Sequence, residues 1–376
     1  PRPVAAPDAA PRARPVRARC SAMASARPAA LLSCASLHLR SIPMSHPVKA
    51  YLIEEVDGAV RAGFTSLASD SLDPGDVEVR IDYASVNYKD ALAATGRGKI
   101  IRRFPCVGGI DAVGVVERSG SARFGAGDAV VVHGWGFGVA HHGGYAERAR
   151  VPADWVNRVP AGLTPLDAIT IGTAGYTAAL AVDLMQLNGC APARGPVLVN
   201  GATGGVAGIA IDMLAQLGFE VVAATSKADQ ADYLLGLGAR RVVDGVAPKG
   251  APNRPLESAQ WAAAVDSLGG EPLAALIPRM HKDAVIASIG NAAGIAFSTT
   301  VMPFILRGVR LIGVNSDNDV AMREHLWQRL ATDLRPRHLA QLRQVADFAE
   351  LPAVMDSVLA GQHRGRTVIR IGAGRG

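Results

Sequence analysis

The pattern of apolar and polar residues changes near residue 164. From Val48 to about Pro160, short apolar runs alternate with Gly and Asp turns, and residues 77–83 alternate apolar and polar positions as a half-buried strand does. The runs 114–117 and 129–133 have the composition of further strands. This pattern predicts a compact unit of the β-barrel type in the first part of the chain.

A helical region begins after Thr164, a residue type that caps helices well. Up to about residue 315, helical spacing then separates most of six strand candidates: 197–200, 219–224, 241–243, 262–266, 285–289 and 309–314. Six parallel strands wound in two halves make a complete Rossmann sheet. Two helices are expected after Asp317, and the final strand, residues 367–371, is expected to return to the first domain.

The stretch VLVNGATGGVAG, residues 197–208, places four glycines between a buried strand and a helix. Backbone N–H groups in such a turn can point at a phosphate, and the helix dipole favours negative charge there. The stretch keeps only part of the usual dinucleotide fingerprint. Because glycine-rich turns also occur for steric reasons alone, an ordinary strand-to-helix turn is an equal alternative when the pattern is taken by itself.

The strand that follows supplies the second observation. Residues 219–225 lie where a right-handed strand–helix–strand crossover would return, and they complete one nucleotide-binding half. A protein that prefers the non-phosphorylated cofactor carries an Asp or Glu at the end of this strand. Here Thr225, Ser226 and Lys227 stand in its place. Two hydroxyls and a cation suit a 2′-phosphate and predict NADPH, the alternative being that Lys227 is a solvated loop lysine.

Length and charge limit the function classes. A chain of 376 residues is expected to form two domains, and its composition is that of an α/β enzyme. Residues 1–43 hold seven arginines against one acid, which accounts for the whole net charge of +6. The remainder is formally neutral, so no basic groove for nucleic acid is implied.

The first 43 residues are rich in Pro, Ala, Arg and Ser and show no sustained periodicity, so we expect a disordered extension. They represent either translated sequence upstream of a start at Met44 or an Arg-rich organelle-targeting peptide; the prolines favour the first. The four cysteines form no metal clip or disulfide framework, which favours the cytoplasm. The longest uncharged stretch near the middle, 168–182, is shorter than a membrane span requires.

Several long motifs, in this order, resemble those of one family. They are SVNYKDALAATGRGKIIRRFPCVGGIDAVGVV (85–116), GWGFGVAHHGGYAERARV (134–151), IGTAGYTAAL (171–180) and TTVMPFILRGVRLIGV (299–314). They resemble the acrylyl-CoA reductase (NADPH) family, also described as putative quinone oxidoreductases, within the medium-chain dehydrogenase/reductase superfamily. The resemblance runs from about Val48 to Ile371. It implies a GroES-like catalytic domain over residues 44–163, a Rossmann domain over 164–316 and a C-terminal return over 317–376.

The resemblance also implies a reaction and a cofactor site. The reaction is reduction of the double bond of acryloyl-CoA by NADPH to give propionyl-CoA. Tyr88 would border the nicotinamide. The residues that would hold the pyrophosphate are Thr203, Gly204, Gly205 and Val206, and those around the 2′-phosphate would be Thr225, Ser226, Lys227 and Arg241.

Zinc-dependent relatives in the superfamily place a Cys and a His at two positions that here lie in Asn87–Asp90 and Gly109–Asp111. Neither segment contains Cys or His, so we expect no metal. Hydride addition to a double bond conjugated with a thioester needs hydrogen-bond donors for the developing enolate oxygen and a proton for Cα. Tyr88 and Lys89 are candidate donors, with Asn87 and Asp90 as orienting groups. Tyr88 as an apolar wall against the nicotinamide is an equal alternative.

Coenzyme A carries phosphates, so cations are expected near the mouth of the site. The stretch GRGKIIRR supplies Arg97, Lys99, Arg102 and Arg103, although a solvated charged face is an equal alternative. In the superfamily the last Rossmann strand pairs across a two-fold axis, which implies a homodimer. Two other functions stay open: reduction of quinones or small enones, and a non-catalytic NADPH-binding protein with affinity for nucleic acid.

Overall fold

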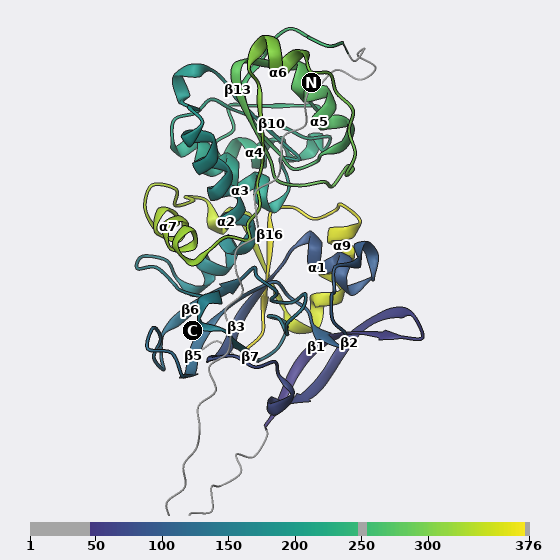
Figure 1. Ribbon diagram of the computed structural model, residues 1–376, viewed down its shortest axis with the longest axis vertical. Helices are drawn as coiled ribbons and strands as arrows, with labels where there is room; N and C mark the ends of the chain where they lie inside the picture. The colour runs from purple at the N-terminus through teal and green to yellow at the C-terminus, as the bar shows by residue number, and fades with distance from the viewer. Residues whose placement is uncertain (1–45, 247–253, 373–376) are drawn as a thin grey trace, which may run out of the picture. The chain divides into compact units, whose positions relative to one another are not determined.

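The structure is a computed structural model that describes residues 46–246 and 254–372. The chain divides after Met44, and every described residue belongs to the part Ser45–Gly376. The predicted extension, residues 1–43, therefore lies outside the described residues. Figure 1 shows the described residues as a ribbon and labels some of the helices and strands with the names used below.

A six-stranded parallel sheet forms the second half of the described chain. Its strands, in spatial order, are β11 (Arg241–Val243), β10 (Val221–Ala224), β9 (Val197–Asn200), β12 (Trp261–Asp266), β13 (Met280–Ser288) and β14 (Arg310–Gly313). Within this sheet the chain starts at the central strand β9, continues to the edge strand β11 and then crosses back to β12, on the other side of β9. This confirms the predicted doubly wound sheet. Its switch point lies between β9 and β12, where ligands of such sheets bind at the carboxyl ends of the strands.

The helices of this half are α2 (Pro165–Leu187), α3 (Gly205–Gln216), α4 (Ala231–Gly236), α5 (Gly270–Leu276), α6 (Met302–Arg307) and α7 (Val320–Ala331). Helix α2 begins where Thr164 accepts a hydrogen bond from Asp167 N. By length and composition α2 is apolar enough to cross a membrane, but 89% of its most apolar window is buried inside the protein. Its apolar character is therefore explained by packing in a central core.

Two further sheets are built mostly from the first half of the chain. The larger one contains β15 (Arg343–Asp347), β16 (Arg366–Arg370), β3 (Val77–Val86), β5 (Asp111–Ser119), β6 (Ala129–His133) and β8 (Val156–Arg158), with β7 (Arg148–Val151) pairing β3. The smaller one contains β2 (Ala59–Ala68), β1 (Pro47–Val56) and β4 (Cys106–Val107). The predominance of antiparallel strands confirms the barrel-type unit.

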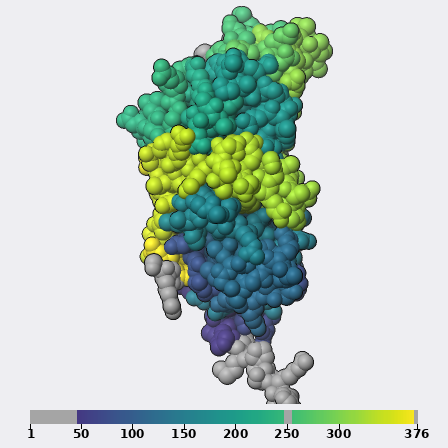
Figure 2. Space-filling model, turned by 90° about the vertical axis from the view of Figure 1, so that its left-hand side faces the viewer, coloured from purple at the N-terminus to yellow at the C-terminus, as the bar shows by residue number. Residues whose placement is uncertain are grey.

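The last strand of the chain rejoins this unit. β16 pairs antiparallel with β3, so the final strand returns to the first unit, as the sequence predicts. The remaining helices are α1 (Tyr88–Ala94), α8 (Leu339–Leu342) and α9 (Leu351–Leu359). Figures 1 and 2 show the C-terminal residues, in yellow, between the blue strands of the first unit and the teal and green Rossmann elements. The C-terminal segment can therefore contribute side chains to a site that both halves border.

Candidate functional site

The main pocket of the described residues has a volume of about 890 Å³ and lies at the carboxyl ends of β9, β10 and β12. Residues of the Rossmann half line most of it, including the turn 200–206 and the segment 224–227. Val86, Asn87 and Tyr88 line it from the first half, and residues 358–366 from the C-terminal segment. The pocket thus occupies the switch point of the sheet, and both halves of the chain contribute walls.

The glycine turn supplies one wall from backbone alone. β9 ends at Asn200, Gly204 N donates to Gly201 O (2.9 Å), and α3 begins at Gly205 with no capping side chain. A Cβ on Gly205 would lie 2.7 Å from Arg366 Cδ and 3.0 Å from Gly365 O, so a side chain does not fit there. Gly204, Gly205 and Val206 line the pocket, and the first N–H groups of α3 have no partner within the helix, so this cradle fits a phosphate.

A buried Asn–Asp pair fixes the strand ends beneath this turn. Asn200 Nδ2 donates to Asp266 Oδ1 (2.5 Å), and Asn200 Oδ1 accepts from Ser267 N (2.7 Å). Asp266 also accepts from the backbone of Gly269, and burial raises its pKa. The sequence analysis did not identify this pair. The signal that could have found it is a polar residue at the end of each of two apolar strands. The pair ties β9 to β12 at the switch point.

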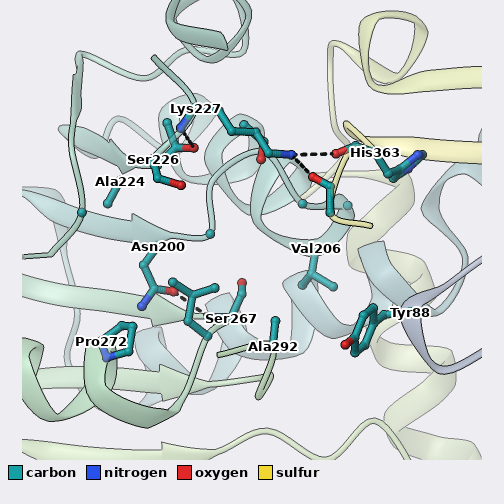
Figure 3. Close-up of a pocket in the computed structure, with 18 of the residues that line it drawn as sticks. Tyr88, Asn200, Val206, Ala224, Ser226, Lys227, Ser267, Pro272, Ala292 and His363 are labelled. Atoms are coloured by element: carbon teal, nitrogen blue, oxygen red, sulfur yellow. Dashed lines mark hydrogen bonds between the residues drawn. The ribbon is translucent and has the colours of Figure 1, made fainter. Parts of the chain in front are cut away.

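The second Rossmann strand delivers three polar residues to the pocket. Thr225, Ser226 and Lys227 all line it, and Thr225 Oγ1 accepts from Lys227 N (3.1 Å). Lys227 Nζ donates to the backbone oxygens of Gly361 (2.5 Å) and His363 (3.2 Å) in the segment before β16. Figure 3 shows this ammonium at the end of the pocket opposite Tyr88. The cation predicted from the sequence therefore lies at the pocket.

Arg241 lies elsewhere. It is the first residue of β11 and pairs with Val222 at the amino end of the parallel sheet, whereas the pocket lies at the carboxyl ends. Its guanidinium stacks over the Trp261 ring, 5.3 Å from the centroid. The structure therefore does not bring Arg241 to Thr225, Ser226 and Lys227. The sequence analysis correctly placed Arg241 at the start of this strand, but the expectation that this end lies near the 2′-phosphate site is wrong.

Tyr88 lies at the other end of the pocket, at the first position of α1. Asn87 is the N-cap of this helix and forms a capping box with Asp90, in which Asn87 N donates to the Asp90 carboxylate (2.9 Å). Because the cap fixes the first turn, the Tyr88 ring is held toward the pocket, where 44% of the residue is exposed. Figure 3 shows the Tyr88 ring beside Val206 in the lining of the pocket. Lys89, the next residue, is exposed and does not line the pocket.

A buried ion-pair network holds Asn87, the residue before Tyr88. The five N–H groups of Arg366 meet five acceptors: Thr170 O, Val86 O, Asn87 Oδ1, Ser85 Oγ and Asp111 Oδ2. Asp111 accepts in addition from Ser85 Oγ (2.6 Å) and Asn87 Nδ2 (2.9 Å). Both charged side chains are almost fully buried. This saturation of donors orients the Asn87 amide.

Asp90 belongs to the same region and is buried. Its carboxylate accepts from Asn87 N (2.9 Å), Asn87 Nδ2 (3.2 Å) and Ile110 N (3.0 Å). Burial, and next the charge of Asp111, raise the pKa of Asp90 from 3.8 to about 7. Asp90 therefore orients the α1 turn, and its protonation state can change near neutral pH.

The predicted coenzyme A cations lie outside the main pocket. Lys99, Arg102 and Arg103 follow α1, and none of them lines this pocket. Arg103 pairs with Asp73, which also accepts from His142 N. No hydrogen bond or ion pair engages the side chains of Lys99 and Arg102 within the part of the chain that the structure describes. These two cations are therefore available at the surface, whereas Arg103 is already paired.

Possible metal ligands are dispersed in the part of the chain that the structure describes. Within residues 46–246 and 254–372, no group of three or more His, Cys, Asp or Glu side chains is placed to hold a metal ion. Asp90 and Asp111, at the two positions discussed for zinc, bond instead to backbone N–H groups and to Asn87. The acids at these positions therefore serve a hydrogen-bond network.

The chain is similar to known proteins over most of its length. Residues 73–161 match the family described as the alcohol dehydrogenase GroES-like domain. The chain is 42% identical to the acrylyl-CoA reductase AcuI of Ruegeria pomeroyi over 85% of its length and 97% of that protein. It is 37% identical to the putative quinone oxidoreductase YhfP of Bacillus subtilis over 87% of its length and all of that protein.

A solved structure extends this similarity to three dimensions. The yhdH oxidoreductase of Salmonella enterica, in complex with NADP, superposes with a TM-score of 0.83 at 43% identity. The match covers 86% of this chain and 100% of that one. The order of a GroES-like unit, a Rossmann sheet and a returning strand is thus common to both. The chain is an oxidoreductase and belongs to the acrylyl-CoA reductase and quinone oxidoreductase-like family of the medium-chain dehydrogenases/reductases.

Proposed function

We propose that this protein reduces the carbon–carbon double bond of acryloyl-CoA to propionyl-CoA with NADPH and without zinc. The observation that carries the proposal is the single pocket that joins a phosphate cradle and Lys227 at one end to Tyr88 at the other. A dinucleotide laid along it would have its 2′-phosphate near Lys227, its central pyrophosphate at the cradle and its nicotinamide near Tyr88. The names of the relatives support the substrate.

The residues present fit the cofactor. The uncapped N-terminus of α3, with Gly205 and Val206, suits the pyrophosphate, together with Thr203 and Gly204 in the turn. Thr225, Ser226 and Lys227 suit a 2′-phosphate because they offer two hydroxyls and a cation. When bound in this way, NADPH supplies a hydride for Cβ of the acryloyl group, which leaves negative charge on the thioester oxygen.

Tyr88 is the residue best placed to act on that charge. Its ring faces the pocket, so its hydroxyl can donate a hydrogen bond to the thioester oxygen. The proton that completes the product at Cα comes from Tyr88 or from water, because Lys89, the other donor expected from the sequence, does not line the pocket. Asn87 and Asp90 position Tyr88 through the cap of α1; Asn87 also lines the pocket, whereas Asp90 is buried and does not. The Arg366–Asp111 pair holds Asn87 in turn.

The substrate carries a second set of phosphates. We assign Lys99 and Arg102 to these phosphates because both side chains are free among the described residues and follow the Tyr88 helix closely in sequence. Arg103 can contribute if it exchanges Asp73 for a phosphate. Replacing both Lys99 and Arg102 by Gln is expected to raise the KM for acryloyl-CoA without changing the KM for NADPH.

The experiment that tests the function is turnover of NADPH, followed by its absorbance, with the full chain. Acryloyl-CoA, crotonyl-CoA and a simple quinone are compared, and NADH replaces NADPH as the control. The proposal expects the fastest turnover with acryloyl-CoA and NADPH. Turnover confined to the quinone would contradict the coenzyme A assignment while leaving the cofactor site intact.

Quinone reduction is the second candidate, because the Bacillus subtilis relative is named as a putative quinone oxidoreductase. The two functions share the pocket and differ in the coenzyme A site. Competition by free coenzyme A separates them, since a quinone site has no phosphate contacts to offer it. Inhibition by coenzyme A, weakened with its 3′-dephospho form, would favour the reductase.

We also propose a homodimer in the cytoplasm. β14 is the edge strand of the Rossmann sheet, and the segment just before it exposes Ile295, Val301, Ile305 and Leu306 by 88%, 62%, 70% and 56%. An open edge beside exposed apolar side chains is suited to pairing with a second copy. Light scattering should give twice the chain mass, and Ile305→Asp should lower it. The two described cysteines, Cys106 and Cys190, are buried and unpaired, as suits a reducing compartment.

A further inference from the structure

A second, smaller hollow adjoins the cofactor end of the main pocket. It has a volume of about 480 Å³ and shares Lys227, Gly361 and His363 with the main pocket. Its other walls come from the segment 229–230 of the Rossmann half and from residues 344, 357, 362 and 364 of the C-terminal half. Lys227 therefore lies on the boundary between the two hollows. No part of the proposed site uses this second space.

The hollow holds a second cation that the sequence analysis did not identify. Arg364 is exposed, its guanidinium lies over the Tyr233 ring at 4.6 Å from the centroid, and Nη1 donates to Gln230 Oε1 (3.2 Å). No carboxylate pairs with Arg364 among the described residues. The acid that lines the hollow, Asp229, accepts instead from Gln230 Nε2 (2.5 Å). The guanidinium therefore keeps donors available for an anion.

The other groups here do not supply this charge. Arg241, predicted as the second cation, lies at the opposite end of its strand. Burial, followed by the charges of Arg366 and Lys227, lowers the pKa of His363 despite its bond to Gly365 O, so this imidazole is neutral near pH 7. Lys227 and Arg364 are the cations that line the hollow within the described part of the chain.

We propose that Arg364 binds the 2′-phosphate of NADPH together with Lys227, so that this phosphate bridges the Rossmann half and the C-terminal segment. The inference rests on the proposed cofactor. Without a phosphate, the Lys227 ammonium holds the segment 361–363 directly through two carbonyls (Figure 3). A phosphate at Lys227 takes over that ammonium and offers its remaining oxygens to Arg364. A planar guanidinium can bind a phosphate through two parallel hydrogen bonds.

The bridge makes cofactor choice a property of both halves of the chain. NADH, which has no 2′-phosphate, would leave the Lys227 contacts to the carbonyls in place and would not engage Arg364. NADPH would tie the segment 361–365 to the sheet more firmly. This segment continues into β16, whose first residue, Arg366, supports the Tyr88 end. Binding of the 2′-phosphate is thus connected by a short stretch of backbone to the network beneath Tyr88.

The test is calorimetric binding of three fragments to the full chain: 2′,5′-ADP, 3′,5′-ADP and 5′-AMP. The variant is Arg364→Gln, which keeps hydrogen-bonding capacity but loses the charge. The matched control is Arg370→Gln, an exposed arginine of β16 that pairs with Asp347. We expect Arg364→Gln to weaken 2′,5′-ADP about tenfold and to leave 5′-AMP unchanged. We expect Arg370→Gln to change neither.

Each other outcome is decisive. If Arg364→Gln weakens 3′,5′-ADP but not 2′,5′-ADP, the arginine serves the phosphate of coenzyme A and the inference is wrong. If Arg241→Gln weakens 2′,5′-ADP and Arg364→Gln does not, the second cation is Arg241. If the wild-type protein binds 2′,5′-ADP no better than 5′-AMP, the proposed NADPH preference fails first. Amide exchange of residues 361–365 gives a further readout: NADPH, but not NADH, should slow it in the wild type and not in Arg364→Gln.

Discussion

The two ends of the main pocket are built in different ways. The phosphate end is local in sequence: a glycine turn, an uncapped helix start and three polar side chains after a strand end, all within 28 consecutive residues, 200–227. The Tyr88 end is made of buried charged side chains from segments far apart in the sequence, joined by Arg366 and Asp111. A substitution in the glycine turn is expected to act through steric overlap, whereas a substitution in the buried network is expected to act through the loss of a charge. The predictions below use this difference.

The largest effect is expected at the charged end. Arg366→Met would leave Asp111 buried without its cation, and removing one partner of a buried pair costs about 3–5 kcal/mol. Urea denaturation should show a loss of this size. The matched control, Arg370→Met, removes an exposed pair on the same strand and should cost less than about 1 kcal/mol. Equal losses in the two variants would show that the buried network has no special weight.

The next effect depends on pH. Because the pKa of Asp90 is raised in the folded protein to about 7, the folded state holds this proton more tightly than the unfolded state does. The stabilisation that comes from this proton on Asp90 is fully present below about pH 4. It is lost as pH rises through 7, which lowers the free energy of unfolding by up to about 4 kcal/mol. The free energy of unfolding should therefore decrease across this window. Asp90→Asn should flatten the decrease, and an unchanged slope in that variant would contradict the assignment.

A smaller effect is expected at the glycine turn of the phosphate end. Gly205→Ala places a Cβ 2.7 Å from Arg366 Cδ and 3.0 Å from Gly365 O, and overpacking of this kind costs about 1–3 kcal/mol. The variant should also bind NADPH more weakly, because α3 must shift from its position in the cradle. Gly313→Ala, which meets nothing within 4 Å, is the matched control for thermal denaturation. Weaker binding in the control as well would remove the steric explanation.

The smallest effect on stability is expected for Tyr88→Phe. The residue is 44% exposed and its hydroxyl has no hydrogen-bond partner among the described residues, so unfolding should change by less than about 0.5 kcal/mol. If the hydroxyl acts on the substrate, kcat should decrease by about 10²-fold or more while the KM for NADPH stays constant. An unchanged kcat would favour the alternative in which Tyr88 is an apolar wall.

The same contrast explains what could be predicted from the sequence. The turn 201–206 and the residues Thr225 to Lys227 were predicted because strand, turn and helix are local patterns that the sequence shows directly. Arg366 was not predicted, since its partner Asn87 lies 279 residues earlier and no local pattern joins them. Nor was Arg364, which reaches the cofactor end only because β16 returns to β3.

Arg241 shows an error that strand direction could have prevented. All strands of the Rossmann sheet are parallel, so the first residue of every strand lies at the amino end, away from the carboxyl ends where the pocket lies. Asp244, which follows β11, lines the pocket, whereas Arg241 at its start stacks on Trp261. Nearness in sequence to a binding strand is therefore a weaker guide than the end of the strand on which a residue lies.

The most direct test of the proposed reaction is isotopic. The full chain is supplied with acryloyl-CoA and NADPH that carries deuterium at the transferable position of the nicotinamide, and the propionyl-CoA is examined by NMR. The account predicts one deuterium at Cβ in ordinary water. With unlabelled NADPH in heavy water, it predicts one deuterium at Cα. Product without cofactor-derived deuterium at Cβ, or no propionyl-CoA while a quinone is reduced, would contradict the proposed hydride addition to the acryloyl double bond.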